Sequence, residues 1–367
     1  MKKIMLSGGG TLGPVMPLLA IADELRRKNP EVTLTFVGTH EGVEEAYVRA
    51  HKLPFQSMRS AKLHRYTTIK NLAQPFNFII ALWQAFRILQ KEKPDVLITA
   101  GGYVSVALHY AARTLKIATM VHVQDSDVGL ANKVMMPFAD LVTCTFQETA
   151  ELLKRYGARH TGNPIRPILF RGDKDRAIAR FHLDPDRKTV LVFGGGTGAL
   201  RLNMMIAEIT PTLVKEFQII HITGTGKNTS VPRFTTQQEE QKKHYHVFEF
   251  LMDEEMADAY KVADIVIARA GLSSISEIAS LKKAAILVPM PNSHQEFNAQ
   301  YVAHKEAAKI CEEGEGYRIL EELSLQLLRD ENVRHQLAKN GERVNRPTAN
   351  EDIRSEIIGL LNKKSTA

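Results

Sequence analysis

Apolar and polar positions divide the first 165 residues into two kinds of segment. Short apolar runs, rich in β-branched residues, are separated by longer stretches with helical periodicity, which is typical of βαβ units in a parallel sheet. The clearest helical stripe places Val15, Leu18 and Leu25 on one face. The predicted strands are Ile4–Leu6, Thr33–Val37, Asp95–Thr99, Ala118–His122 and Leu141–Thr145.

A second series of apolar runs follows a charged, proline-containing stretch over residues 162–190, which we interpret as a linker. We therefore expect a first domain over 1–165, a second over 166–345 and a C-terminal segment over 346–367. The pattern over residues 352–361 of this segment predicts an amphipathic helix, and packing of this helix back on the first domain is one arrangement that the pattern allows. The strands predicted in the second domain are Thr189–Phe193, Gln218–Ile222, His244–Phe248, Asp264–Ala268 and Ala285–Val288.

Length and composition support two α/β domains. The chain has 367 residues, of which 44% are hydrophobic and 24% charged, so disordered and fibrous classes are excluded. Cys144 and Cys311 are too far apart for a disulfide framework or a metal knuckle, and a reducing compartment is expected. The N-terminus lacks the apolar core of a signal peptide. A net charge of +7 suits anionic partners without choosing among them.

Two glycine-rich segments each follow the first strand of a domain and open a helix. They are Ser7–Pro14 and Gly194–Ala199. Glycines allow close approach of a ligand, and the amides at a helix start attract anions. The first segment does not carry the full dinucleotide fingerprint, GxGxxG with an acidic residue about 20 positions on, so NAD is disfavoured. Neither segment has the Gly-Lys-Ser/Thr ending of a triphosphate loop, so an ATPase function is disfavoured as well. Tight turns without a ligand explain the same glycines.

The segment Ala268–Ile278 is the most informative, because two hydroxyls and a carboxylate follow a buried strand and a glycine. A carboxylate at Glu277 can accept hydrogen bonds from two ribose hydroxyls while the amides near Ser273 and Ser274 face a phosphate. A capping box, with Ser274 as N-cap and Glu277 at N3, explains the spacing equally well. Farther on, His294 and Gln295 begin a polar segment that opens another helix.

Taken together, these segments resemble the MurG family of peptidoglycan glycosyltransferases. The family's first loop reads GGTGGHxxP, and residues 9–17 occupy it here. The resemblance covers most of the chain, and the combination of motifs is specific. Further matches are Gly101–Ser105, Gly129–Lys133, Gly162–Arg166, Gly194–Ala199, Phe250–Asp264, Glu277 and His294–Ala299.

The resemblance implies a GT-B fold, in which two Rossmann-like domains with parallel sheets face a cleft. It implies transfer of N-acetylglucosamine from UDP-N-acetylglucosamine to lipid I, the undecaprenyl-diphosphate-linked muramyl pentapeptide, to form lipid II. It also implies peripheral attachment to the cytoplasmic face of the membrane through an anionic surface, with no nucleic acid, cofactor or metal. A cation at Asp125 and Asp127 is a minor alternative.

The resemblance also carries over residue roles. Glu277 is expected to bind the ribose, Phe250 and Leu251 the uracil, and Gln295 the sugar hydroxyls, with His294 where some members have another glutamine. The diphosphate residues are Ser273, Ser274, Arg166 and Gly196. On the acceptor side, Gly10, Thr11 and Asn132 are expected to bind substrate, and Thr11 and Gly13 to take part in catalysis.

The chain departs from the family pattern at two catalytic segments. Leu12 and Pro14 replace glycine and histidine in the first loop, and proline cannot accept a proton, although it suits a first helical turn. The family's HEQN segment reads His122-Val123-Gln124-Asp125. We hypothesise that Asp125, or less favourably His122 or Asp127, is the base; capping of the next helix is the alternative. A related transferase with another lipid acceptor and a catalytically silent nucleotide-sugar-binding subunit are therefore kept as rival functions.

Basic residues precede an aromatic and apolar stretch between residues 62 and 86. Such a surface is suited to an anionic membrane leaflet, although ordinary core burial explains part of the pattern. The stretch is too short and too polar to span a bilayer. The basic residues are Lys62, His64, Arg65 and Lys70, and the apolar ones Leu72, Phe76, Phe78, Ile79, Ile80, Leu82, Trp83 and Phe86.

Overall fold

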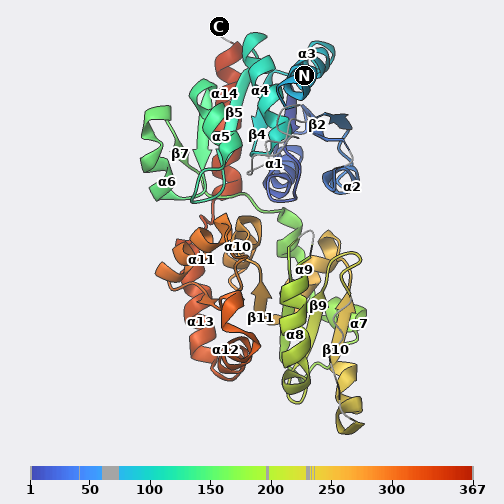
Figure 1. Cartoon of the computed structure of the whole chain (residues 1–367). Helices are drawn as coiled ribbons and strands as arrows, with labels where there is room; N and C mark the ends of the chain where they lie inside the picture. The colour runs from blue at the N-terminus through green and yellow to red at the C-terminus, as the bar shows by residue number, and fades with distance from the viewer. Residues whose placement is uncertain are drawn as a thin grey trace. The chain divides into compact units, whose positions relative to one another are not determined.

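A computed structural model describes residues 2–40, 42–59, 74–195, 198–228, 232, 234 and 236–365. The chain folds into two compact units (Figure 1). Unit 1 comprises Met1–Arg166 and Thr348–Ala367, and unit 2 comprises Pro167–Pro347. None of the helices in the described ranges is both long and apolar enough to cross a bilayer.

Unit 1 is built on a parallel sheet that has seven strands within the described residues, in the order β3-β2-β1-β4-β5-β6-β7. The five strands predicted in this domain are confirmed. The pattern did not reveal β3, an edge strand with one fully buried position, or β7, which has two residues. The strands are β1 (Lys2–Ser7), β2 (Val32–Thr39), β3 (Phe55–Met58), β4 (Val96–Thr99), β5 (Ala118–Val123), β6 (Leu141–Cys144) and β7 (Arg159–His160).

Helices cover both faces of this sheet. On one face α1 and α14 pack together, and Ile353, Ile357 and Leu361 of α14 are buried in a cluster with residues of β1 and α1. On the other face α3 and α4 form a second apolar cluster. The helices of unit 1 are α1 (Val15–Lys28), α2 (Glu44–Ala50), α3 (Gln74–Glu92), α4 (Tyr103–Thr114), α5 (Leu130–Met135), α6 (Gln147–Leu152) and α14 (Ala349–Ser365).

Unit 2 has a second parallel sheet, with six strands among the described residues in the order β10-β9-β8-β11-β12-β13. Its five predicted strands are confirmed, and only the two-residue β13 was missed. The strands are β8 (Thr189–Phe193), β9 (Gln218–Ile222), β10 (Tyr245–Phe248), β11 (Ala263–Ala268), β12 (Ala284–Leu287) and β13 (Lys309–Ile310).

The helices of unit 2 surround its sheet, and α8, α12 and α13 contribute to a core cluster with β8, β9, β11 and β12. They are α7 (Lys174–Phe181), α8 (Leu200–Leu213), α9 (Asp253–Val262), α10 (Leu272–Ser280), α11 (His294–His304), α12 (Tyr317–Arg329) and α13 (Glu331–Asn340). Short 3₁₀ turns complete the chain at η2 (Met136–Phe138), η3 (Lys154–Tyr156), η4 (Pro167–Arg171), η5 (Thr236–His244), η6 (Glu313–Glu315) and η7 (Gly341–Arg343).

The two sheets share one topological feature that locates their sites. In each, the first strand of the unit lies in the middle, and the strand order reverses beside it, between β1 and β4 in unit 1 and between β8 and β11 in unit 2. Ligands of such doubly wound sheets bind outside the carboxyl ends of the strands at this switch point. Both glycine-rich segments and the Ala268–Ile278 segment follow these strands. The predicted class of two Rossmann-like domains is confirmed.

Candidate functional site

Helix α10 begins at Leu272, directly after the turn that follows β11. Its N-cap is Gly271, in extended geometry (φ −71°, ψ 137°), and no side-chain hydrogen bond caps it. The Ile275 amide already donates to the Gly271 carbonyl at 3.0 Å. The capping box predicted as an alternative, with Ser274 as N-cap, is therefore wrong. Ser273 and Ser274 occupy the second and third helical positions, at the end of the helix whose backbone amides attract anions.

Glu277 lies on the second turn of α10 and is only 7% exposed. The Tyr260 hydroxyl of α9 donates a hydrogen bond to Glu277 Oε2 at 3.1 Å. Tyr260 is itself fixed, since its ring packs edge-on against Phe193 of β8 with centroids 5.9 Å apart. A buried carboxylate with a fixed orientation is a strong acceptor for hydroxyl donors. Tyr260 was not singled out from the sequence, where it reads as one more core position of α9.

Phe250 and Leu251 follow β10, between that strand and α9. Phe250 is 38% exposed, whereas Leu251 is buried. The Gly224 amide donates to the Glu249 carbonyl at 3.0 Å, and the Met252 amide donates to Glu255 Oε2 at 2.7 Å. Hydrogen bonds thus fix the backbone on both sides of Phe250. The exposed Phe250 ring can stack on a planar base.

The glycine-rich segment after β8 is a tight turn. Gly195 and Gly198 have left-handed backbones, with φ of 82° and 67°. A Cβ on Gly198 would collide with the Thr223 carbonyl, and Lys227 Nζ donates to the Gly198 carbonyl at 3.0 Å. These glycines are required by the backbone itself. Gly196, which the family resemblance places at the diphosphate, lies outside the described residues.

His294 and Gln295 open α11, beyond the end of β12. The N-cap is Ser293, whose hydroxyl accepts from the Gln295 amide at 3.2 Å. Gln295 Oε1 accepts from the Met290 amide at 3.0 Å, which orients the side chain so that its amino group remains a donor. His294 is exposed, and the fully buried Asn298 donates to the Ala270 carbonyl at 3.3 Å. The strands β11 and β12 therefore place the α10 and α11 starts at one edge of the sheet.

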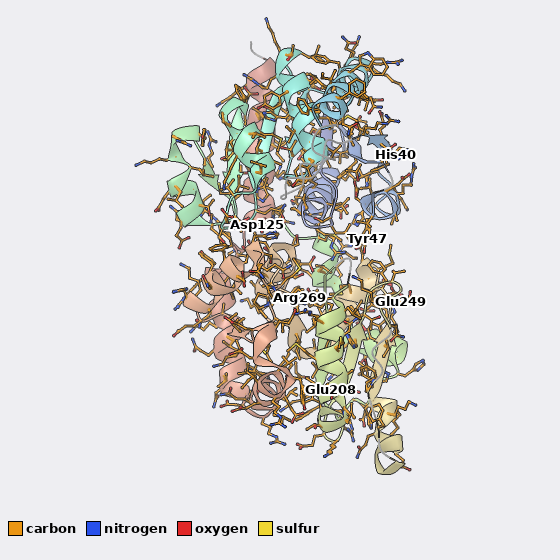
Figure 2. All side chains as sticks on the ribbon, in the orientation of Figure 1. His40, Tyr47, Asp125, Glu208, Glu249 and Arg269 are labelled. Atoms are coloured by element: carbon orange, nitrogen blue, oxygen red, sulfur yellow. The ribbon has the colours of Figure 1, made fainter. Side chains whose placement is uncertain are left out.

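Arg269 is a further residue at this edge to which the sequence assigned no role (Figure 2). It directly follows β11, and its guanidinium donates to the Val288 and Pro289 carbonyls, both at 3.1 Å, and to Glu313 at 2.5 Å. Glu313 also pairs with Arg201 at 2.9 Å. Arg269 thus braces the segment that leads to α11. A lone arginine after a buried strand, beside the glycine turn, was the available signal.

In unit 1, the segment after β1 is packed closely against two neighbouring segments. A Cβ on Gly102 would lie 2.7 Å from the Gly9 carbonyl oxygen, and a Cβ on Gly9 would collide with the carboxylate of the fully buried Glu44. Gly10 has a left-handed backbone with φ 85°. Gly10, Thr11 and Gly13 are exposed, so their backbone is accessible to a ligand.

The two departures from the family pattern in this segment have structural explanations. Leu12 is buried in the cluster formed with α1 and α14. Pro14 is the N-cap of α1 with φ −66°, which the proline ring imposes at no cost. The substitution of histidine by proline is therefore compatible with the fold, as expected.

Asn132 and Pro14 come together around Gly101. A Cβ on Gly101 would lie 3.6 Å from Asn132 Oδ1 and 3.9 Å from Pro14 Cγ. Asn132 is 7% exposed, and its Oδ1 has no hydrogen-bond partner among the described residues. A buried acceptor of this kind is costly unless a donor reaches it. At the carboxyl edge of this sheet, the Asn132 Oδ1 acceptor is thus available to a hydrogen-bond donor close to Pro14, which occupies the position of the family histidine.

Asp125 follows β5 and is half-buried at the same edge (Figure 2). The next helix, α5, has Gly129 as its N-cap and no side-chain cap. Neither Asp125 nor Asp127 is therefore the N-cap residue of this helix. Asp127 is exposed and pairs with Lys133 at 3.5 Å. Arg166, at the end of the first part of unit 1, is buried.

His122 is sealed inside unit 1. Its Nδ1 lies 2.9 Å from the Thr143 hydroxyl and its Nε2 lies 3.1 Å from Asn163 Oδ1. Burial lowers the pKa of His122 from 6.5 to about 4. Both ring nitrogens are occupied and no face is exposed to solvent, so His122 does not serve as the base. Through its hydrogen bond to Asn163, His122 links the Gly162–Arg166 segment to β5.

Two parallel Rossmann-like sheets in one chain, with acid and amide groups at their carboxyl ends, define the GT-B class of fold, and the family matches place the chain among its glycosyltransferases. The glycosyltransferase family 28 N-terminal domain matches residues 4–144, and the family 28 C-terminal domain matches residues 189–353. Among solved structures, MurG of Acinetobacter baumannii has a TM-score of 0.71 at 25% identity, covering 99% of this chain and 100% of that one. The UDP-bound MnaA of S. aureus has a TM-score of 0.70 at 15% identity, over 99% and 97%, which indicates the fold alone.

Curated relatives define the family more closely. The UDP-N-acetylglucosamine--N-acetylmuramyl-(pentapeptide) pyrophosphoryl-undecaprenol N-acetylglucosamine transferase of Lachnospira eligens is 37% identical over 290 residues, 79% of each chain. The same-named enzyme of Clostridium perfringens is 35% identical over 288 residues, 78% of each chain. A Bacillus anthracis protein with this name, numbered 2, is 32% identical over 79% of this chain and 80% of its own. The chain belongs to this transferase family, the MurG family.

Proposed function

We propose that the protein transfers N-acetylglucosamine from UDP-N-acetylglucosamine to undecaprenyl-diphosphate-linked N-acetylmuramyl pentapeptide, and so converts lipid I into lipid II in peptidoglycan synthesis. The observation that carries this proposal is the buried Glu277 carboxylate, oriented by Tyr260 one turn after the start of α10. This arrangement is suited to a ribose diol beside a diphosphate.

Unit 2 recognises the donor. Glu277 accepts hydrogen bonds from the ribose hydroxyls, and Phe250 and Leu251 contact the uracil. Amides and hydroxyls at Ser273 and Ser274 hold the diphosphate, together with Gly196. Gln295 donates to sugar hydroxyls through the amino group that its bond to Met290 leaves available, with His294 beside it. These donors are preorganised for the charge that develops on the leaving UDP.

Transfer proceeds as an inverting, metal-independent single displacement. The acceptor hydroxyl attacks the anomeric carbon, its proton passes to a base, and the bond to UDP breaks without a covalent sugar–enzyme intermediate. Asp125 takes the place of the family histidine as base, since Pro14 has no proton acceptor. Gly10, Thr11, Gly13 and Asn132 line the acceptor side. The unpartnered Asn132 Oδ1 is suited to an acceptor hydroxyl or amide.

The protein attaches peripherally to the cytoplasmic face of the cell membrane through α3. Phe76, Ile79 and Trp83 are 68%, 63% and 57% exposed, and they recur at the three- and four-residue spacing of one helical face. Arg87 stacks over the Trp83 ring at 4.9 Å and adds a cation for an anionic leaflet. The basic residues Lys62, His64, Arg65 and Lys70 lie outside the described residues. No nucleic-acid partner is proposed.

A second candidate rests on Pro14. Loss of the family histidine is compatible with a transferase that uses another lipid acceptor, or with a subunit that binds the nucleotide sugar without turning it over. Both would keep the donor site of unit 2 intact while changing the acceptor side of unit 1.

One assay separates these functions. UDP release is measured with UDP-N-acetylglucosamine, with and without a lipid I analogue, and UDP binding is measured by titration calorimetry. Acceptor-dependent release supports the proposed reaction. Binding without release, with lipid I and with other polyprenyl-diphosphate sugars, favours the silent subunit. No binding of UDP at all contradicts every function above.

A further inference from the structure

Unit 1 contains a cavity that no step of the proposed reaction uses. It has a volume of about 460 Å³, within the range of small-molecule sites. The end of α4, the starts of β5, β6 and β7, and the last turns of α14 enclose it. The lining residues are Arg113, Lys116, Ile117, Ala118, Asp140, Leu141, Arg159, Glu356, Gly359, Leu360 and Lys363.

The cavity lies at the opposite edge of the sheet from the proposed acceptor site. Ala118 and Leu141 are the first residues of β5 and β6, whereas Asp125 follows the end of β5. At 3.3 Å per residue, β5 separates Ala118 from Val123 by about 17 Å, and Asp125 lies two residues farther along the chain. A ligand in the cavity is therefore neither the sugar donor nor the reacting part of the acceptor.

The polar lining carries an excess of positive charge. Arg113 pairs with Asp140 at 2.7 Å, and Arg159 pairs with Glu356. Lys116 and Lys363 add two further cations, and Lys116 makes no ion pair within the described ranges. Two carboxylates thus face four cationic side chains, which matches an anion of about two charges, the charge of a phosphate monoester near pH 7. Guanidinium and ammonium groups are the preferred partners of phosphate.

The remaining lining is apolar and includes a glycine inside a helix. Ile117, Leu141 and Leu360 supply aliphatic surface beside the charges. Gly359 lies inside α14, where glycine is less favourable than alanine. A Cβ on Gly359 would meet no atom within 4 Å, so no close approach of other segments requires glycine there. Its effect is to leave the cavity wall open.

We propose that this cavity binds a phosphate monoester that carries a short apolar group. The phosphate lies among Lys116, Lys363 and the two arginines, and the apolar group lies on Ile117, Leu141 and Leu360. A soluble phosphorylated metabolite and a phosphatidic-acid headgroup share this chemistry. The site is independent of the proposed transferase reaction, because binding to it involves no residue of the donor or acceptor sites.

Titration calorimetry of the full chain tests the site with three probes: dihexanoyl phosphatidic acid, glycerol 3-phosphate and dihexanoyl phosphatidylcholine. Phosphatidic acid is expected to bind most tightly, glycerol 3-phosphate more weakly, and the zwitterionic lipid at least tenfold more weakly than phosphatidic acid. Absence of heat with both phosphate monoesters at millimolar concentration would overturn the proposal, as would equal affinity for the zwitterionic lipid.

Two substitutions at one position supply the matched control. Gly359→Phe fills the cavity and is expected to weaken phosphatidic acid binding at least tenfold, whereas Gly359→Ala leaves it within about twofold. Thermal unfolding of the same variants, followed by circular dichroism, verifies that unit 1, which contains Gly359, is folded in each. Unchanged phosphatidic acid affinity in Gly359→Phe would contradict the assigned location. Lys116→Glu is expected to lose the affinity of both phosphate monoesters, and retention of that affinity would equally count against the site.

The source of the ligand follows from vesicles that contain phosphatidic acid. Sedimentation that Gly359→Phe reduces and Gly359→Ala does not would assign the site to a membrane lipid. Calorimetric binding of glycerol 3-phosphate together with vesicle binding that is the same in both variants would assign it to a soluble metabolite. Both outcomes support a phosphate monoester site and differ only in where the phosphate comes from.

Discussion

At the residue scale, the proposed donor site depends on how one carboxylate is oriented. Glu277 is buried, and its orientation is set by Tyr260 rather than by the helix cap that local sequence suggests. A buried acceptor that loses its charge leaves ligand hydroxyls poorly paired, at a cost of about 1.5–3 kcal/mol for a hydrogen bond to a charged group. Substitution of Glu277 should therefore weaken binding of the ribose strongly, and substitution of Tyr260 should weaken it less.

Glu277→Gln is expected to raise the KM for UDP-N-acetylglucosamine by about 10- to 100-fold, which is the range that such a hydrogen-bond loss implies. Tyr260→Phe removes only the orienting hydroxyl and is expected to have a smaller effect. Steady-state UDP release and calorimetry with UDP measure both variants. An unchanged KM and UDP affinity in Glu277→Gln would exclude this residue from donor binding.

The proposed base is tested by a second substitution at this scale. Asp125→Asn keeps the size of the side chain and removes its proton affinity, so kcat is expected to fall by about 10²- to 10⁴-fold, the usual contribution of a general base. Asp127→Asn is the control, since Asp127 is exposed and paired with Lys133. Full turnover of Asp125→Asn with its correct acceptor would remove Asp125 from the mechanism.

At the element scale, α3 has two different faces. Ala81, Ala85 and Leu89 are buried against α4, which confirms that core packing accounts for part of the apolar stretch. Phe76, Ile79 and Trp83 remain exposed. Core packing therefore explains the buried positions of the stretch, and the exposed positions form the face that we propose to contact the membrane.

Replacement of Ile79 and Trp83 by serine is expected to reduce sedimentation with anionic vesicles several-fold at low salt, because the apolar contribution to membrane binding scales with buried area. Thermal stability should change little, since neither side chain is in the core. Gln90→Ser, on the exposed side of the same helix, is the control. Equal sedimentation of the double variant and the control would show that α3 does not contact the membrane.

Helix α14 illustrates what an element's sequence leaves open. Its amphipathic pattern predicted a helix, but not the partner of its apolar stripe. In the structure, Ile353, Ile357 and Leu361 pack into unit 1, and Asn350 exchanges two hydrogen bonds with the Ile165 backbone, at 2.9 and 2.8 Å. The apolar face of α14 could pack on any complementary apolar surface, so only the tertiary structure shows which surface it contacts.

At the scale of the whole molecule, each unit contains a buried histidine on a strand next to the centre of its sheet. His122 contacts Asn163 in unit 1, and His221 lies 3.1 Å from Asn203 Oδ1 and 2.8 Å from the Tyr245 hydroxyl in unit 2. Burial lowers the pKa of His122 to about 4 and that of His221 to about 3. The unfolded chain therefore binds protons below pH 6.5 that the folded chain does not.

The free energy of unfolding is expected to be unaffected by these histidines above pH 6.5. It should decrease as the pH falls towards 4, by at most about 1.4 kcal/mol per pH unit for each such histidine. Because glutamine does not titrate, His122→Gln should reduce the slope of unfolding free energy against pH by up to the contribution of one proton, about 1.4 kcal/mol per pH unit. The exposed His335→Gln should leave it unchanged. Urea unfolding between pH 7.5 and 4.5 measures the slopes, and identical slopes in His122→Gln and the unsubstituted protein would refute the assignment.

Much of the architecture was predictable because local periodicity reports local structure. All ten strands predicted from apolar runs are present, and the three that were missed are short edge strands with few buried positions. The motif segments also lie where the pattern placed them, at the carboxyl ends of strands. Tyr260, Arg269 and the start of α10 were not predictable, because each depends on a neighbour distant along the chain.

The amino-acid sequence by itself determined the class of the fold, the order of its elements and the segments that carry polar groups, since these follow from the spacing of apolar, glycine and charged residues. Only the tertiary structure decided which helix end stays uncapped, which imidazole is sealed from solvent, and that a glycine in the last helix opens a basic cavity. Those properties arise from contacts between residues far apart in the chain, and no local pattern encodes which partners meet.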